Sequence, residues 1–335
     1  MKSAISSEKK STMHGHNNSH SRTNPGVEFQ AQWINDIRIN LSAVQRRVAT
    51  LKNRRTVKKQ WQAAWLLKAV SCIDLTTLSG QDTPGKVRRL CAKARTPISL
   101  ELQQALGVEQ LKITTGAVCV YHEMVTTAVS ALAGTSIPVA AVSTGFPAGL
   151  SSFATRLQEI KLSVAAGAKE IDIVITRAHV LNANWAALYD EVKSFREACG
   201  EAHMKTIIAT GELSTMNNVA RASMVAMMAG SDFIKTSTGM EVTNASLEVT
   251  LVMVRMIRHY QSLTGYRVGF KPAGGISTAK DAINYLILIK EELGDDWLNP
   301  QLFRFGASSL LADIERQLDH FVTGRYSAFH RHPIS

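Results

Sequence analysis

From residue 71 onward the chain repeats one unit, a short apolar or β-branched run followed by a segment of helical pattern. We expect eight strands, at residues 71–75, 117–121, 139–143, 170–175, 205–209, 232–236, 267–271 and 302–305. The intervals between the last seven have room for helices, such as 155–166, 185–198, 217–228 and 247–262. Alternating strands and helices require a parallel sheet with right-handed crossovers. Eight such units close most simply as an α/β fold, the (β/α)8 or TIM barrel, and an open doubly wound sheet is the alternative.

The length of the chain allows this barrel to form one domain. The 335 residues are 45% apolar and 19% charged, which excludes a disordered or collagen-like chain. We expect a disordered polar arm at 1–25, a basic helical extension at 26–60, the barrel at 61–325 and a C-terminal tail at 326–335. Amphipathic helices within 33–59 are expected outside the main domain, whereas a helix at 58–70 is expected to pack on it.

The net charge of +11 is concentrated in the extension. Residues 1–60 hold 12 basic residues and three acids, which leaves 26 basic and 24 acidic residues in the rest of the chain. The main body is therefore close to neutral. It has no clustered basic run and only 6% aromatic residues, which argues against a nucleic-acid partner.

The cysteines and the apolar runs indicate the cellular compartment of the protein. Cys72, Cys91, Cys119 and Cys199 form no CxxC pair, so neither a disulfide framework nor structural zinc is indicated. The first twenty residues are polar, and no apolar run is long enough to span a membrane. We expect a cytoplasmic protein with no membrane partner. The basic run at 54–59 fits a nuclear address, although a solvated helix start explains it better.

Charged side chains end or interrupt four of the predicted strands. They are Asp74, Asp172, Lys235 and Lys271. In a barrel the reacting groups lie at the carboxyl ends of the strands. We therefore expect these four residues around one pocket.

Two of the four are lysines on consecutive strands, Lys235 and Lys271. A buried lysine is costly unless it is paired or neutral. Repulsion between the two ammonium groups, together with partial burial, lowers the pKa of at least one and supplies a neutral amine near pH 7. Such an amine can attack an aldehyde and form an imine. The alternative is that each lysine only pairs with Asp172 or Asp74, or caps its strand.

Asp172 lies between Ile171 and Ile173, so its side chain faces either the barrel interior or the helices. An interior carboxylate beside two ammonium groups stays ionised and can move protons through a water molecule. A purely structural aspartate fits the same spacing equally well.

The loops after the last two strands have the pattern of an anion site. One contains Gly274 and Gly275, and the other contains Gly306, Ser308 and Ser309. Adjacent glycines let backbone N–H groups approach an anion, and the serines can begin a helix whose N-terminus favours phosphate. Because barrels use these two loops for phosphate, we expect a phosphate group here. Ordinary tight turns and helix caps are the alternative.

Thr236 and Ser237 come directly after Lys235, at the end of the sixth strand, and offer hydroxyls to substrate oxygens, although capping alone gives the same pattern. No His, Asp and Glu cluster has the spacing of a metal site, and His14, His16 and His20 lie in the polar arm. We therefore expect chemistry that uses no metal and no other cofactor.

Six segments closely resemble the deoxyribose-phosphate aldolase family. They are Ile73-Asp-Leu-Thr-Thr-Leu, Glu170-Ile-Asp-Ile-Val, Ala209-Thr-Gly-Glu-Leu, Asp232-Phe-Ile-Lys-Thr-Ser-Thr-Gly, Val268-Gly-Phe-Lys-Pro-Ala-Gly-Gly and Arg304-Phe-Gly-Ala-Ser-Ser-Leu-Leu. The resemblance runs in order from about Trp61 to Ile314 and includes every predicted strand. The N-terminal extension and the tail at 323–326 look like the longer, eukaryotic-type members.

The resemblance implies a class I aldolase that reversibly splits 2-deoxy-D-ribose 5-phosphate into D-glyceraldehyde 3-phosphate and acetaldehyde, in deoxyribonucleoside catabolism. By motif, Lys235 matches the imine-forming lysine. Lys271 matches the lysine that lowers its pKa and joins the proton relay, and Asp172 matches the acid/base carboxylate. The residues expected to bind substrate are Asp74, Cys119, Thr236, Ser237, Gly274, Gly275, Gly306, Ser308 and Ser309.

The chain departs from the family pattern at two places. Shorter members have Tyr-Pro where this chain has Tyr121-His122. They also end in a tyrosine that assists proton transfer, and nothing in the sequence assigns that role to Tyr326.

Two other functions remain open from the sequence. One is a transaldolase-like enzyme that forms a lysine imine with another sugar phosphate. The other, motivated by the basic extension, is an RNA-binding scaffold with a vestigial barrel. The sequence also leaves the oligomeric state open, a homo-oligomer included.

Overall fold

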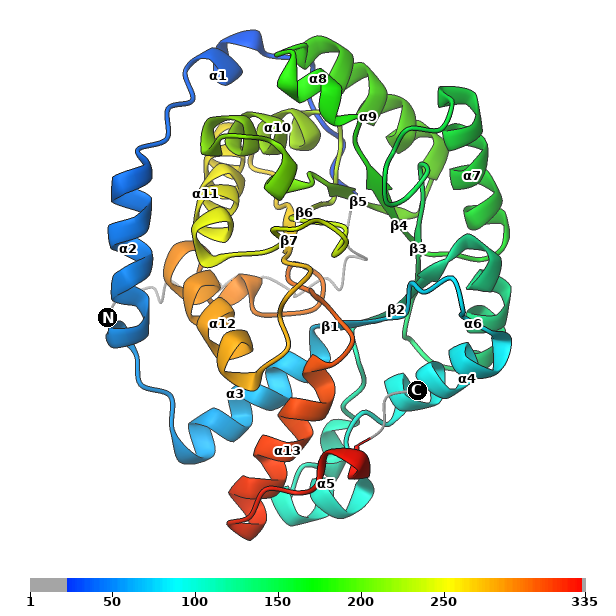
Figure 1. The fold of residues 1–335 in the computed structure, drawn as a ribbon, viewed down its shortest axis with the longest axis vertical. Helices are drawn as coiled ribbons and strands as arrows, with labels where there is room; N and C mark the ends of the chain where they lie inside the picture. The colour runs from blue at the N-terminus through cyan, green and yellow to red at the C-terminus, as the bar shows by residue number, and fades with distance from the viewer. Residues whose placement is uncertain (1–22, 333–335) are drawn as a thin grey trace, which may run out of the picture.

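The computed structural model describes residues 23–332, and its helices surround an eight-stranded parallel barrel (Figure 1). The strands are β1 (Ile73–Thr76), β2 (Ala117–Tyr121), β3 (Val139–Val142), β4 (Glu170–Val174), β5 (His203–Ile207), β6 (Phe233–Lys235), β7 (Gly269–Lys271) and β8 (Phe305–Ala307). They pair in the order β7-β6-β5-β4-β3-β2-β1-β8. Two isolated parallel bridges, Phe270 to Phe303 and Ala273 to Gly306, connect the two ends of this order. The predicted (β/α)8 barrel is confirmed.

The strand ends differ from the predicted ones by up to three residues. β2 matches its prediction, whereas β1 begins only at Ile73 because Ser71 still belongs to α3 (Lys59–Ser71). The prediction for the last strand was wrong, since β8 spans Phe305–Ala307. The segment before it approaches β7 instead, where the Arg304 N–H donates to the Phe270 carbonyl at 3.1 Å.

Eight main helices follow the strands. They are α4 (Pro84–Arg95), α6 (Val125–Ala131), α7 (Phe153–Ala165), α9 (Trp185–Cys199), α10 (Met216–Met228), α11 (Leu247–Thr264), α12 (Ala279–Leu293) and α13 (Leu310–Thr323). Six of them begin at a Ser, Thr or Asn whose side chain accepts a backbone N–H, as the capping preference predicts. The cap residue of α13, Ser309, makes no such bond. The first turn of α13 therefore keeps N–H donors that its own cap does not satisfy.

The basic extension packs on the barrel, contrary to the prediction that its helices lie outside the main domain. It forms α1 (Ala31–Asn35) and α2 (Leu41–Arg54), and α2 lies along α11 and α12 (Figure 1). Val44, Val48 and Leu51 are buried there in the common core. The sequence shows an amphipathic helix, but the surface that receives its apolar side is formed by helices more than 190 residues further along the chain.

Acidic residues of α12 pair with basic residues of the extension. The Nε atom of Arg47 lies 3.0 Å from Oε1 of Glu292, and Nε of Arg55 lies 2.6 Å from Oε1 of Glu291. Acidic side chains of the barrel thus neutralise part of the positive charge of the extension, so these arginines do not require a nucleic-acid partner. As predicted, the following helix α3 packs on the barrel, against α12 and α13.

The expected polar arm at 1–25 lies mostly outside the described residues, and its end was placed too late. Asn24 is buried, and its Nδ2 donates to the carbonyls of Met227 and Ser231, each at 2.9 Å. Its backbone N–H also donates to the Asp232 carboxylate. Asn24 therefore belongs to the barrel domain.

Within residues 23–332, no helix is long and apolar enough to cross a bilayer. All four cysteines are buried and free.

Candidate active site

Strand register places the two candidate lysines side by side. The Cα atoms of Lys235 on β6 and Lys271 on β7 are direct partners in the parallel ladder. Residues paired in a ladder point to the same face of the sheet, and both side chains contact Asp172 from β4 in the barrel interior. Asp74 from β1 enters the same interior and pairs with Lys271. All four residues are buried, as a position among closely packed strands requires.

One carboxylate oxygen joins the two lysines. The Nζ atoms of Lys235 and Lys271 each lie 2.8 Å from Oδ2 of Asp172. Lys271 also donates to Oδ2 of Asp74, whereas the only carboxylate paired with Lys235 within the described chain is Asp172. The interior orientation of Asp172 is thereby established, and the amines differ in the number of anions they contact.

Three more charged residues lie beside this group, and their pattern in the sequence predicts a role for none of them. Nζ of Lys205 on β5 lies 3.2 Å from Oδ1 of Asp172 and also bonds Glu170 on β4. Arg304, just before β8, donates to Glu170 at 2.8 Å and to Asp74 at 2.5 Å. Glu170 precedes Asp172 by two residues and so shares its face. That spacing was a signal the sequence offered.

We call these seven side chains the ionic network. Its members are Asp74, Glu170, Asp172, Lys205, Lys235, Lys271 and Arg304. The network holds four basic groups and three carboxylates, so one positive charge is in excess when every group is ionised. Loss of a single proton from one lysine makes the buried network neutral.

The environment selects Lys235 for that loss. Burial lowers the pKa of Lys235, and the positive charge of Lys271 adds to this against the opposing effect of Asp172. Burial also acts to lower the pKa of Lys271, but Asp172 and Asp74 outweigh it and raise the pKa. Burial acts to raise the pKa of Asp172, yet Lys205, Lys235 and Lys271 hold it well below its usual value. The result is one activated amine beside a protonated lysine and an ionised carboxylate.

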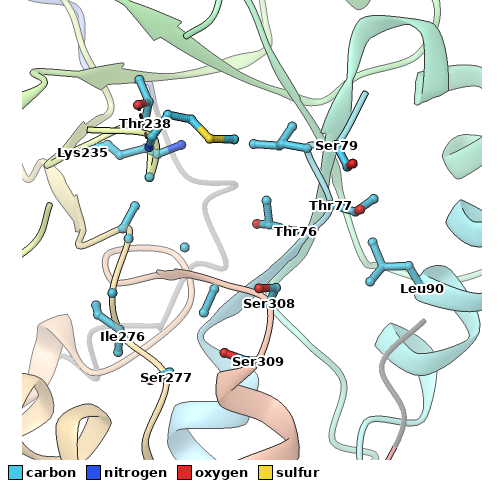
Figure 2. Close-up of a pocket in the computed structure, with 18 of the residues that line it drawn as sticks. Thr76, Thr77, Ser79, Leu90, Lys235, Thr238, Ile276, Ser277, Ser308 and Ser309 are labelled. Carbon is cyan, nitrogen blue, oxygen red and sulfur yellow. Dashed lines mark hydrogen bonds between the residues drawn. The ribbon is translucent and has the colours of Figure 1, made fainter. Parts of the chain in front are cut away.

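A cavity of about 530 Å³ opens above the network at the carboxyl ends of the strands (Figure 2). Lys235 is the one network residue among the described residues that line it. Figure 2 shows the amine reaching toward the cavity, across from Thr76, Thr77 and Ser79. A carbonyl compound in this cavity can therefore reach Lys235 but not the more deeply buried Lys271.

The two predicted phosphate loops line the same cavity. Gly274, Gly275, Gly306, Ser308 and Ser309 all contribute to its wall. The φ angles of Gly274 and Gly275 are +81° and +79°, a backbone conformation that other residues rarely adopt. Within the described chain no hydrogen bond uses the N–H of either glycine as donor. Together with the uncapped first turn of α13, these loops offer several N–H groups to an anion.

Four of the residues expected to bind substrate do not line the cavity. Asp74 pairs with Lys271 and Arg304, and Cys119 is buried against Ala140 and Val142. Thr236 and Ser237 are fully buried. Their contact with a substrate stays a prediction.

The hydroxyl groups of Thr236 and Ser237 have different surroundings. Oγ1 of Thr236 accepts the N–H of Ala273 at 3.0 Å, which ties the loop after β6 to the loop after β7. Oγ of Ser237 is buried and has no hydrogen-bond partner among the described residues. Thr236 therefore holds the loops together.

Neither His122 nor Tyr326, where the chain departs from the family pattern, is among the described residues that line the cavity. Nδ1 of His122 lies 2.9 Å from Oγ of Ser163 on α7. Tyr326 follows the C-terminal end of α13, where its ring stacks on His320 with 4.2 Å between ring centroids. Because the cavity lies at the opposite end of α13, Tyr326 is not positioned to transfer a proton there.

The described part of the chain contains no candidate metal site, that is, no group of three or more His, Cys, Asp or Glu side chains that could hold an ion.

The family model and the relatives that this chain resembles in sequence are all aldolases. Residues 68–315 match the family described as DeoC/LacD family aldolase. Human deoxyribose-phosphate aldolase is 60% identical over 314 residues, which are 93% of this chain and 99% of the human protein. The mouse protein of the same name is 61% identical over 312 residues, 92% of this chain and 98% of the mouse protein.

Solved structures share the fold. A deoxyribose phosphate aldolase from Aeropyrum pernix, described as a tetramer, aligns with a TM-score of 0.58 at 20% identity. The alignment covers 79% of this chain and 98% of the other. At this identity the likeness supports the barrel architecture.

Proposed function

The chain belongs to the DeoC/LacD family of aldolases, and from this premise we propose that it reversibly cleaves 2-deoxy-D-ribose 5-phosphate into D-glyceraldehyde 3-phosphate and acetaldehyde. The observation that carries the proposal is the position of Lys235. Its pKa is lowered, it contacts Asp172, and it lies on the wall of a cavity shared with two loops suited to phosphate. The high identity to the human and mouse relatives supports this substrate.

The first step is formation of an imine. Neutral Nζ of Lys235 attacks the C1 aldehyde of the open-chain sugar, and the carbinolamine loses water to form a protonated imine. This adds one positive charge to a network that was neutral with Lys235 unprotonated. The added charge makes the nitrogen an electron sink for the next step.

Cleavage falls on the C2–C3 bond of the sugar. The protonated imine at C1 accepts the electron pair of that bond, so C1 and C2 stay on Lys235 as the enamine of acetaldehyde and C3 to C5 leave as D-glyceraldehyde 3-phosphate. A C3–C4 break would instead leave three carbons on the lysine and could not form acetaldehyde. The C3 hydroxyl proton leaves through a water to the pair of Asp172 and Lys271, which share a hydrogen bond of 2.8 Å. D-Glyceraldehyde 3-phosphate departs, and the enamine on Lys235 is protonated at C2 and hydrolysed to acetaldehyde.

The phosphate group occupies the other side of the cavity. There, N–H groups of the loop at Gly274 and Gly275 and of the first turn of α13 face it, with the hydroxyls of Ser308 and Ser309 close by. Holding the phosphate fixes the distance from the chain end to C1 and so presents the aldehyde to Lys235.

Substrate comparison tests the assignment. Purified protein should release acetaldehyde and D-glyceraldehyde 3-phosphate from 2-deoxyribose 5-phosphate, and should cleave ribose 5-phosphate and fructose-type phosphates far more slowly. The reverse preference would favour a transaldolase-like enzyme. Lys235→Met should remove the activity, with Lys280→Met as a control because Lys280 is exposed on α12.

Location and assembly form a second part of the proposal. We expect a cytoplasmic enzyme that forms a homo-oligomer, and nuclear entry through the basic run at 54–59 is the alternative location. The basic run joins α2 to α3, and the pairing of Arg55 with Glu291 favours a structural role for at least one of its charges. Cell fractionation and light scattering of the purified protein decide these points.

A further inference from the structure

The cavity contains a second basic side chain that the proposed mechanism does not use. Among the described residues that line it, Lys235 and Lys86 are the only charged ones. Lys235 must be neutral to act as a nucleophile. A sugar phosphate brings about −1.5 to −2 charges at pH 7, as phosphate monoesters on proteins do. Backbone N–H groups supply only partial charges, so among the described residues of the wall the Lys86 ammonium is the one charged donor available to the phosphate.

Lys86 occupies an unfavourable place for a lysine in helix α4. Thr83 caps this helix through a bond from the Lys86 backbone N–H, so Lys86 lies in the first turn. Positive charge is disfavoured at that end of a helix, and this turn contains no acidic residue. The helix end and the ammonium group instead add their attraction for an anion.

A buried carboxylate holds Lys86 at the cavity wall. Nζ of Lys86 lies 2.9 Å from Oδ1 of Asp82, whose side chain is 3% exposed. Asp82 is fixed in turn by the Thr77 hydroxyl at 2.8 Å and by the Ser79 N–H at 3.0 Å. An ammonium group has three donors, and Asp82 occupies one. The side chain of Lys86 is 29% exposed and lines the cavity, so protein does not enclose it completely.

Barrel topology brings Lys86 to the phosphate side. β1 pairs with β8, so the loop and helix after β1 are neighbours of the loop that carries Ser308 and Ser309. Leu90, one helical turn beyond Lys86, also lines the cavity. Figure 2 shows Leu90 on the wall that carries Thr77 and Ser79, with Ser308 next along the cavity.

We propose that Lys86 binds the phosphate of the substrate and determines the preference of this enzyme for phosphorylated over free 2-deoxyribose. The proposal rests on the proposed aldolase function. Asp82 serves as a positioning residue that orients Lys86, and Lys86 is a substrate-binding residue.

The experiment compares two substrates with one variant. Lys86→Met should lower kcat/KM for 2-deoxyribose 5-phosphate by about 10- to 100-fold, mainly through KM, as expected for a lost hydrogen bond to a charged group. It should leave kcat/KM for unphosphorylated 2-deoxyribose unchanged. Lys86→Arg should retain most of the preference. Arg88→Met, which removes an exposed charge from the same helix, should change neither value.

Two further measurements separate this proposal from the proposed function. Inorganic phosphate, titrated by calorimetry, should bind Lys86→Met about tenfold or more weakly than wild type. This holds whether or not the wild-type protein cleaves 2-deoxyribose 5-phosphate. Acetaldehyde should be trapped on Lys235 at the same rate in wild type and in Lys86→Met. Equal rates would show that the variant is folded and that its Lys235 amine is still reactive.

The proposal is wrong if Lys86→Met lowers kcat/KM for both sugars equally, or if its preference for the phosphorylated sugar stays within twofold of wild type. Unchanged phosphate binding overturns it as well. A wild-type protein that binds phosphate through Lys86 but cleaves neither sugar overturns the proposed function instead.

Discussion

Replacing Lys271 with methionine removes one positive charge from the ionic network and keeps a side chain of similar length. The Nζ atoms of Lys271 and Lys235 both lie 2.8 Å from Oδ2 of Asp172. At a separation of about 5 Å and an effective dielectric constant of about 20, their repulsion is about 3 kcal/mol. In the variant, three basic groups balance three carboxylates with Lys235 protonated. We therefore expect Lys271→Met to raise the pKa of Lys235.

The measurement is the rate at which cyanoborohydride traps acetaldehyde on Lys235, followed by mass spectrometry across a range of pH. An energy of about 3 kcal/mol corresponds to about a hundredfold lower fraction of neutral amine. Trapping in Lys271→Met should therefore be about a hundredfold slower at pH 7 and should recover as the pH rises. Lys280→Met, which removes an exposed lysine, should behave as wild type.

Turnover separates the two roles assigned to Lys271. Even at a pH where trapping has recovered, cleavage of 2-deoxyribose 5-phosphate should stay slow, because the proton relay lacks Lys271. If the variant traps acetaldehyde at pH 7 at nearly the wild-type rate, repulsion by Lys271 does not activate Lys235. A trapping defect that alkaline pH leaves in place would also refute the electrostatic reasoning.

Three further predictions concern the extension, the network and the phosphate loop. Leu51→Ala should lower the free energy of unfolding, measured by urea denaturation, by about 2–5 kcal/mol, because Leu51 on α2 is buried against the barrel. Leu41→Ala, at an exposed position of the same helix, should change it by less than about 0.5 kcal/mol. The pKa values of Asp74 and Asp172 are lowered in the folded protein, so both carboxylates stabilise the fold fully above the ordinary carboxyl pKa of about 3.9 and lose this effect as the pH falls toward their folded values. The midpoint of urea unfolding should therefore decrease in that acid range, and it should decrease less steeply in Asp74→Asn. Gly274→Ala places a Cβ 2.6 Å from that of Asn244 at a φ of +81°, so KM for 2-deoxyribose 5-phosphate should rise by about tenfold, and an unchanged KM would remove this loop from phosphate binding.

The barrel could be predicted because its signal is local. Each strand is a short apolar run and each helix a longer periodic one, so the alternation from β1 to α13 is visible along the chain. The exact ends were less predictable because a ladder depends on partners far along the chain. β8 illustrates this: residues 302–304 look like a strand, yet regular pairing with β1 starts only at Phe305.

The extension was misplaced for a similar reason. Its amphipathic pattern was visible, but which surface would bury Val48 and Leu51 depends on α11 and α12. Asn24 gave no apolar signal at all, and its burial depends on hydrogen bonds to carbonyls at the end of α10.

The candidate site was predictable where charge interrupts an apolar strand. Lys235, Lys271 and Asp172 stood out on that basis, and the structure brings them together around one carboxylate oxygen. Lys205 and Arg304 were inside predicted strands as well, but sequence alone does not show that two more basic groups and Glu170 complete one buried network. Lys86 was hidden for a different reason, since a lysine in the first turn of a helix looks ordinary until the cavity beside it is known.

The identity of the lysine that forms the imine is the most direct test of the account. Wild-type protein treated with acetaldehyde and cyanoborohydride should carry one ethyl group, located by peptide mass spectrometry on Lys235, and Lys235→Met should carry none there. An ethyl group on Lys271 or Lys86 instead, or no adduct in a protein that actively cleaves 2-deoxyribose 5-phosphate, would contradict the assignment of Lys235 as the nucleophile.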